Sequence, residues 1–68
     1  MKFCELPAKH KMTALQWAED AINDLYQQQG IPKVDALSPE VIQLAKERDY
    51  EIEYGEYEPG IPYERLSY

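Results

Sequence analysis

The chain has 68 residues, of which 44% are hydrophobic and 29% charged, values that are ordinary for one small globular domain. Thirteen Asp and Glu outnumber seven Lys and Arg, giving a net charge of −6 at pH 7. This balance argues against direct contact with nucleic acid or anionic lipid, because neutralising phosphates requires a basic patch. A membrane span needs about 18 consecutive apolar residues, and no apolar run in the sequence approaches that length. The N-terminus lacks the apolar core of a secretory signal.

Residues 14–29 are predicted to form an amphipathic helix. Thr13 and Gln16 have the spacing of a capping box, in which each side chain bonds the backbone of the other. Gly30 follows the segment and supplies the left-handed residue that commonly ends a helix. The apolar residues that fall on one continuous arc of this helix, and are expected to be buried, are Leu15, Ala18, Ala21, Ile22, Leu25 and Tyr26.

A second, shorter helix is predicted over residues 39–48. Ser38 is a suitable N-cap and Pro39 suits the first helical position. The nine-residue loop between the helices carries regularly spaced apolar residues, which predicts that it lies on the core. The expected buried face of the second helix is formed by Val41, Leu44 and Ala45, and the apolar loop residues are Ile31, Val34 and Leu37.

From residue 50 onward the apolar period changes from about 3.6 to about 2. Tyr50, Ile52 and Tyr54 alternate with two glutamates, which predicts a half-buried strand over residues 50–54. Residues 2–6 are the other candidate strand. Because an isolated pair of strands is marginally stable, we expect these two to pair and to pack on the helices.

The expected fold is therefore α+β, a single small domain in which a two-helix hairpin packs on a short two-stranded sheet in the order β-α-α-β. The expected parts are an arm or edge strand at 1–12, a helical hairpin at 13–48, a strand at 50–54 and an extended, acidic, tyrosine-rich tail at 55–68.

Few side chains suit catalysis or metal binding. Cys4 and His10 are the only thiol and the only imidazole, and the first is expected to be a small strand residue and the second to be solvated. A zinc site needs four ligands, so it would require two chains that pool these residues. No Gly-rich phosphate loop or EF-hand pattern occurs. The sequence predicts no enzymatic activity and no cofactor or metal, and its single cysteine fits a reducing, cytoplasmic setting.

The acidic charge is concentrated near the C-terminus. Residues 1–12 sum to +2 and residues 13–68 to −8. Residues 50–64 contain five Glu, four Tyr and no basic side chain. On a strand, Glu51 and Glu53 point the same way, about 6.6 Å apart. A row of carboxylates beside tyrosines suits a groove lined by Arg and Lys, of the kind that binds nucleic acid or acidic peptides.

The alternative interpretation of this region is a solvated strand face with no partner. A further surface is the edge of the first helix, where an aromatic residue borders the apolar arc. The residues predicted to bind a partner are Glu51, Glu53, Tyr54, Glu56, Tyr57, Glu58, Tyr63 and Trp17.

Two functions are compatible with these surfaces. The first is a small acidic regulator or inhibitor that docks on a basic surface of another protein, such as a surface that binds nucleic acid. The second is a structural or accessory subunit whose contact is apolar, through Trp17 and the face of residues 14–29. Salt separates the two, because screening weakens only the charged contact. The wide apolar stripe on so short a chain also predicts a homodimer.

Overall fold

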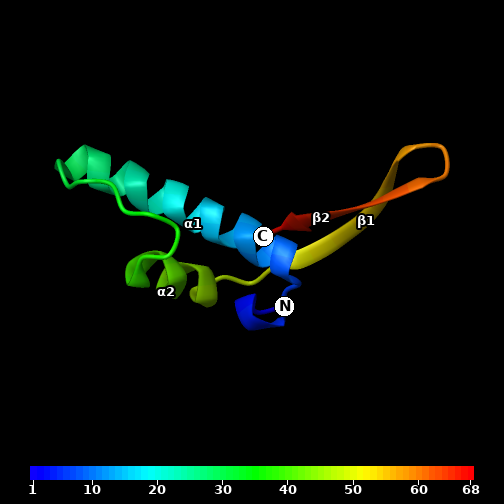
Figure 1. Ribbon diagram of the computed structural model, residues 1–68, viewed down its shortest axis with the longest axis horizontal. Coiled ribbons are helices and arrows are strands. Elements are labelled where there is room, and N and C mark those ends of the chain that lie inside the picture. The colour runs from blue at the N-terminus through cyan, green and yellow to red at the C-terminus, as the bar shows by residue number, and fades with distance from the viewer.

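Two helices followed by an antiparallel β-hairpin make up the fold of the computed structural model, which describes residues 1–68 (Figure 1). α2 lies beside α1, and the hairpin extends away from both helices. The α+β class is confirmed, but the predicted order β-α-α-β is wrong, because the order is α-α-β-β. The elements are a 3₁₀ turn, η1 (Phe3–Glu5), then α1 (Ala8–Gln29), α2 (Pro39–Glu47), β1 (Glu51–Glu58) and β2 (Ile61–Ser67).

The predicted strand at residues 2–6 is replaced by η1. The Glu5 N–H donates to the Lys2 carbonyl at 2.9 Å, and the Lys2 N–H donates to Glu5 Oε1 at 3.2 Å. These local bonds compete with a strand ladder and bend the chain. Only one isolated antiparallel bridge remains, between Lys2 and Asp49, and it is accompanied by an ion pair of 2.8 Å between their side chains.

α1 begins at Ala8 rather than at residue 14. The Pro7 carbonyl accepts the first turn's bond from the His10 N–H at 3.0 Å. Thr13 is therefore inside the helix, where its hydroxyl donates to the Lys9 carbonyl at 3.3 Å, and it is not a cap. The earlier start places His10 on the buried side of the helix, only 5% exposed, so the expectation that it is solvated is wrong.

The predictions for the end of α1 and for the second helix are confirmed. Gly30 follows α1 with φ of 74°, a backbone conformation that favours glycine, and α2 spans nine residues after Ser38. The loop between the helices is held by Asn23, whose side chain accepts from the Val34 N–H at 2.9 Å and donates to the Val34 carbonyl at 3.0 Å. Leu37, also expected to cover the core, is 74% exposed.

The core consists of two small clusters joined by Phe3, which packs against both. The buried residues of α1 are four positions apart, and the two alanines among them, Ala14 and Ala18, allow neighbouring elements to approach closely. One cluster lies between α1 and α2 and contains Ala18, Ile22, Val41 and Ala45. The other lies between α1 and the base of the hairpin and contains Leu6, Ala14, Tyr50 and Leu66. Leu25, assigned to the buried arc by its position, is 55% exposed.

The segment predicted to be an extended tail forms the second half of the hairpin. β1 runs through Gly55 to Glu58, and Pro59-Gly60 makes the turn, with φ of 83° at Gly60. Proline followed by a glycine of positive φ is the pattern of a type II turn. A bulge at Tyr57 shifts the register between the two strands just before the turn. The predicted strand at residues 50–54 is thus only the first part of a longer one.

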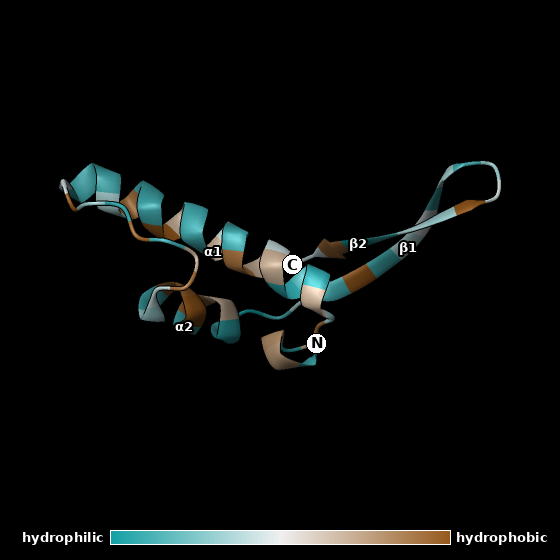
Figure 2. Cartoon of the chain, viewed as in Figure 1, coloured by the Kyte–Doolittle hydropathy of each residue, from teal (hydrophilic) through white to brown (hydrophobic).

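The hairpin makes the molecule elongated. Its principal extents are 48 × 23 × 16 Å and its radius of gyration is 14.2 Å, against about 11 Å for a compact chain of this length. Its accessible surface is 4969 Å², against about 4,450 Å² for a globular monomer of this size. Figure 2 shows mostly hydrophilic strands with isolated hydrophobic segments. The apolar contacts of the hairpin with the body are made at its base, where Ile52 and Leu66 pack on the cluster that contains Ala14.

Candidate functional site

The projecting hairpin has two faces that differ in what they contact. Residues alternate along β1, and the register places Glu53 opposite Arg65 and Ile52 opposite Leu66. Ile52 and Leu66 pack toward α1 and define the inner face. Glu51 and Glu53 lie on the other side, the outer face, and both are exposed to solvent.

An aromatic pair covers the outer part of the outer face. Tyr63 lies directly opposite Gly55, and a Cβ on that glycine would lie 2.7 Å from the Tyr63 ring. The missing side chain therefore lets the Tyr63 ring lie on the strand backbone. Tyr57 stacks on Tyr63 with ring centroids 4.1 Å apart and planes 22° from parallel. Because Tyr57 is 75% exposed, the pair presents an ordered aromatic surface to solvent.

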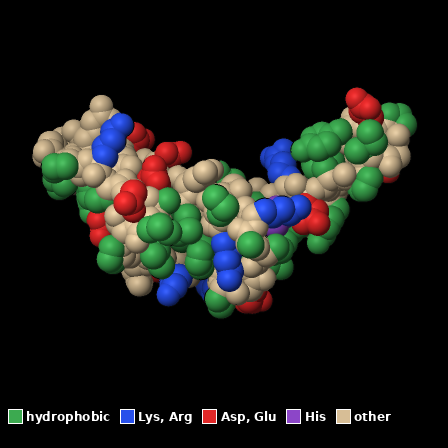
Figure 3. Space-filling model, in the orientation of Figure 1, with side chains coloured by type: hydrophobic (Ala, Val, Ile, Leu, Met, Phe, Trp, Pro, Cys, Tyr) green, Lys and Arg blue, Asp and Glu red, His purple; other side chains and the backbone are tan.

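Glu53 neighbours this aromatic pair on the outer face, and further glutamates lie along the rest of β1. Glu53 makes an ion pair with Arg65, Nε to Oε2, at 3.8 Å, and accepts a hydrogen bond from the Ser67 hydroxyl at 3.2 Å. No ion pair involves the remaining glutamates of β1, which are Glu51, Glu56 and Glu58. In Figure 3 the hairpin carries a cluster of hydrophobic side chains, with acidic groups at its edges and a Lys or Arg side chain on the side toward the body. The outer face can thus accept hydrogen bonds from cations and offer rings to stack on them.

The eight predicted partner-binding residues do not form one surface. The outer face brings together Glu51, Glu53, Tyr57 and Tyr63. Tyr54 alternates onto the inner face, where it is 76% exposed because the helices do not reach it. Glu56 follows Tyr54 on that face by the same alternation, and Glu58 flanks the turn.

Trp17 lies apart from the other predicted residues, at the base of the hairpin. It is half-buried against the cluster containing Leu66, and its ring centroid is 4.7 Å from that of Tyr68. The Tyr68 ring also lies under the Arg48 guanidinium, at 4.6 Å. These contacts give Trp17 a packing role within the chain.

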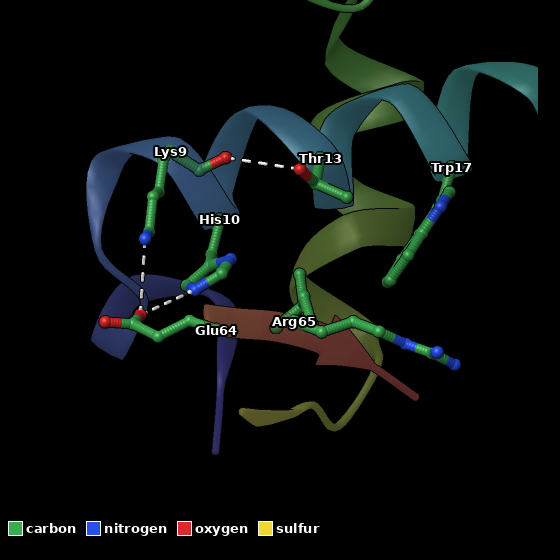
Figure 4. A pocket seen from close by; sticks show the side chains of 7 residues that line it. Lys9, His10, Thr13, Trp17, Glu64 and Arg65 are labelled. Atoms are coloured by element: carbon green, nitrogen blue, oxygen red, sulfur yellow. Dashed lines mark hydrogen bonds and ion pairs between the residues drawn. The ribbon is translucent and has the colours of Figure 1, made fainter. Parts of the chain in front are cut away.

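A polar anchor holds the hairpin against the first turn of α1 (Figure 4). Glu64, on β2, lies 3.1 Å from Nε2 of the buried His10 and 3.4 Å from Nζ of Lys9. A shallow groove of about 430 Å³ opens beside the anchor, with Trp17 and Arg65 on its walls. The sequence interpretation missed this anchor because it placed His10 in a solvated arm. The available signal was the four-residue spacing of Ile22 and Ala18, which continues back through Ala14 to position 10.

The anchor predicts a dependence of stability on pH. The hydrogen bond with His10, with a smaller contribution from the charge of Lys9, holds the pKa of Glu64 below its ordinary value. A carboxyl group whose pKa is lower in the folded chain than in the unfolded chain stabilises the folded state. This stabilisation is fully present well above about pH 4.3, the unfolded value, and is lost as the pH falls through the folded pKa. We expect Glu64→Gln to abolish this part of the acid destabilisation.

Urea unfolding at several pH values between about 5 and about 3 measures this effect. The matched control is Glu58→Gln, which neutralises a glutamate of the same hairpin that makes no ion pair. The control is expected to lose stability with falling pH as the wild-type chain does. The same loss in Glu64→Gln would show that the anchor does not contribute.

The start of β1 is fixed by Tyr50. Its buried hydroxyl donates to the Ala45 carbonyl at 2.8 Å, which satisfies one of the last carbonyls of α2. Burial raises the pKa of this phenol above its ordinary value. The direction in which the hairpin leaves the body is therefore set by a bond to α2 as well as by the anchor on α1.

No group of three or more His, Cys, Asp or Glu side chains is arranged to hold a metal ion, and Cys4 is free and exposed. None of the helices combines the length and hydropathy required to cross a bilayer. No protein-family model, curated protein or solved structure matches the chain.

Proposed function

We propose that the chain is a small, non-enzymatic protein-binding module of the cytoplasm that docks its hairpin on a basic surface of another protein. By occupying an Arg- and Lys-lined groove, it acts as a regulator or inhibitor of what that groove otherwise binds. The observation that carries the proposal is the outer face, where Tyr57 stacks on Tyr63 on the strand side that also carries Glu51 and Glu53, away from the body of the molecule.

The geometry supports docking rather than mere solvation in two ways. The hairpin exposes Tyr57 although the stack already holds its ring in one place, so little side-chain freedom remains to be lost on binding. The glutamates without ion pairs leave the negative potential of the hairpin largely uncancelled. Tyrosine is among the residues most often found at the energetic centre of interfaces.

The proposal is tested by capturing partners at low and high salt and measuring their binding kinetics. We expect Tyr57→Ala to dissociate about 30-fold faster, equivalent to about 2 kcal/mol. The double charge reversal Glu51→Lys/Glu53→Lys is expected mainly to slow association and to flatten the salt dependence.

The matched control is Asp20→Lys/Asp24→Lys, which changes the net charge equally at exposed positions of α1. We expect the control to retain wild-type dissociation, and all variants to retain native circular dichroism. If the hairpin variants bind the captured partner as the wild-type chain does, the outer face is only a solvated surface.

An apolar face of α1 supports a second candidate, an accessory subunit or homodimer. Met12 and Leu37 are 65% and 74% exposed, and together with Leu15 they line an apolar groove of about 240 Å³ between α1 and the interhelical loop. This groove is on the helical part of the chain and does not involve the hairpin. Self-association through it would leave the outer face free for a partner.

Sedimentation at micromolar concentration tests the homodimer. We expect twice the monomer mass for the wild-type chain, and the monomer mass for Leu37→Lys, which places a charge in the apolar groove. Ile61→Lys, at a 50% exposed position on the hairpin, is the matched control and is expected to remain dimeric. A wild-type monomer at hundreds of micromolar would contradict the dimer.

A further inference from the structure

One edge of β1 is open and has the start of a neighbouring strand beside it. Tyr50, immediately before β1, exchanges two backbone bonds with Met1: its N–H donates to the Met1 carbonyl at 2.8 Å, and its carbonyl accepts from the Met1 amino group at 3.0 Å. Lys2 continues this pairing opposite Asp49, but the chain turns away into η1 at Phe3. Figure 1 shows the N-terminus beside the start of β1 and no strand further along.

The open edge continues along the rest of β1. Backbone groups of successive strand residues point to opposite edges, so those of Ile52 and Tyr54 point to the same edge as those of Tyr50. β2 lies at the other edge, because both backbone groups of Tyr50 are bonded to Met1 and the pairing with β2 begins at the next residue, Glu51. The sheet has two strands only, so this edge carries free hydrogen-bonding groups.

Charge decides what can pair with this edge. A second copy of the chain, paired through β1, would bring four glutamates against four glutamates, and like charges across a strand pair are destabilising. β1 contains no proline, unlike β2, which carries Pro62 and lacks an N–H at that position. The open edge of β1 therefore suits a strand of opposite charge.

The two faces of the hairpin set the side-chain pattern of such a strand. A side chain opposite Glu53 on the outer side would lie about 5 Å from it and diagonally across from Glu51, which favours Lys or Arg at the outer positions. Side chains on its inner side would lie beside Ile52 and Tyr54, which favours apolar or aromatic residues between them. About five residues span the edge from Ile52 to Glu56.

We propose that the open edge of β1 takes up an extended segment of the partner, in which Lys or Arg alternates with apolar residues, as a third strand of the sheet. This inference rests on the proposed function, because it assigns the mode by which the basic partner is recognised. The main chain supplies the ladder bonds and the alternating side chains supply specificity, as in other cases of strand addition.

The probe that tests it is the peptide acetyl-Lys-Val-Lys-Val-Lys-Val-amide, titrated into the full chain and followed by NMR. In the proposed pairing the valines lie opposite Ile52 and Tyr54, so the valine N–H groups face β1 and the lysine N–H groups face away. N-methylation of the valines is expected to weaken binding at least tenfold. N-methylation of the lysines is the matched control and is expected to leave the affinity within about twofold.

Two protein variants distinguish the contribution of the Tyr54 backbone N–H from that of its side chain. Tyr54→Pro removes an N–H from the open edge, and Tyr54→Ala removes the same ring while keeping that N–H. Because this N–H points away from β2, the proline is compatible with the hairpin. We expect the alanine variant to bind the peptide within a few-fold of wild type and the proline variant to bind at least tenfold more weakly. Amide exchange at Ile52 and Tyr54 of the wild-type chain should slow when the peptide is added.

Two results would overturn the inference. One is equal binding of the valine-methylated and unmodified peptides, and the other is no binding of the unmodified peptide at millimolar concentration. Either result leaves the proposed function standing if partner capture still depends on Glu51, Glu53 and Tyr57. Conversely, if variants at those three residues capture the partner as the wild-type chain does, the proposed function is wrong, regardless of how the peptides bind.

Discussion

Leu66→Ala is expected to lower the free energy of unfolding by about 3 kcal/mol. Leu66 is 6% exposed and packs with Leu6, Ala14 and Tyr50 in the cluster that joins the hairpin to α1. Replacing a buried leucine by alanine removes its transfer free energy and leaves a cavity, at a typical cost of about 2–5 kcal/mol. Since a chain of this length has a total stability of about 3–10 kcal/mol, the loss is a large fraction of it.

Leu25→Ala is the matched control for this prediction, because Leu25 is 55% exposed on α1. Leucine and alanine have similar helix propensities, so we expect a change of about 0.5 kcal/mol or less. Urea unfolding measures both variants. Equal losses in the two would mean that Leu66 does not connect the hairpin to the body.

The helices could be predicted from sequence because their stop signals and apolar spacing are local. Gly30 marked the end of α1 correctly, and Ser38-Pro39 marked the start of α2. The predicted start of α1 is too late because Thr13 and Gln16 fit a capping pattern that is also compatible with a helix interior. Tertiary packing of His10 against β2 favours the longer helix, and no local pattern reports that contact.

The strand pairing could not be predicted from periodicity alone. Residues 2–6 are a short segment with apolar side chains that Pro7 closes, but Lys2 and Glu5 satisfy each other's backbone groups locally. The hairpin was signalled by Pro59-Gly60, a turn dipeptide between two segments rich in tyrosine and isoleucine. The residues after this turn are expected from sequence to be an extended tail, so the pairing of β2 with β1 is not predicted.

The candidate site was predicted in its composition but not in its geometry. Residues 50–64 contain no basic side chain in the sequence. The antiparallel register nevertheless brings Arg65 beside Glu53 in space. The same register separates Tyr54 from Tyr57, which the sequence places only three positions apart. Gly55 explains the stack of Tyr57 and Tyr63, since it leaves room for a ring that no strand propensity would indicate.

Ala18→Leu is expected to destabilise the chain by about 3 kcal/mol, because it overfills the contact between α1 and α2. Ala18 has no exposed surface and packs with Val41 and Ala45 of α2. Added methylenes in a close-packed contact force side chains from their rotamers or push the helices apart, at a typical cost of about 1–3 kcal/mol. The upper value applies here because small residues on both helices set their separation.

Ala8→Leu, at the exposed first residue of α1, makes the same chemical change and should shift stability by about 0.5 kcal/mol or less. Thermal and urea unfolding of both variants decide the matter: if Ala18→Leu is as stable as Ala8→Leu, the two helices do not meet through this residue.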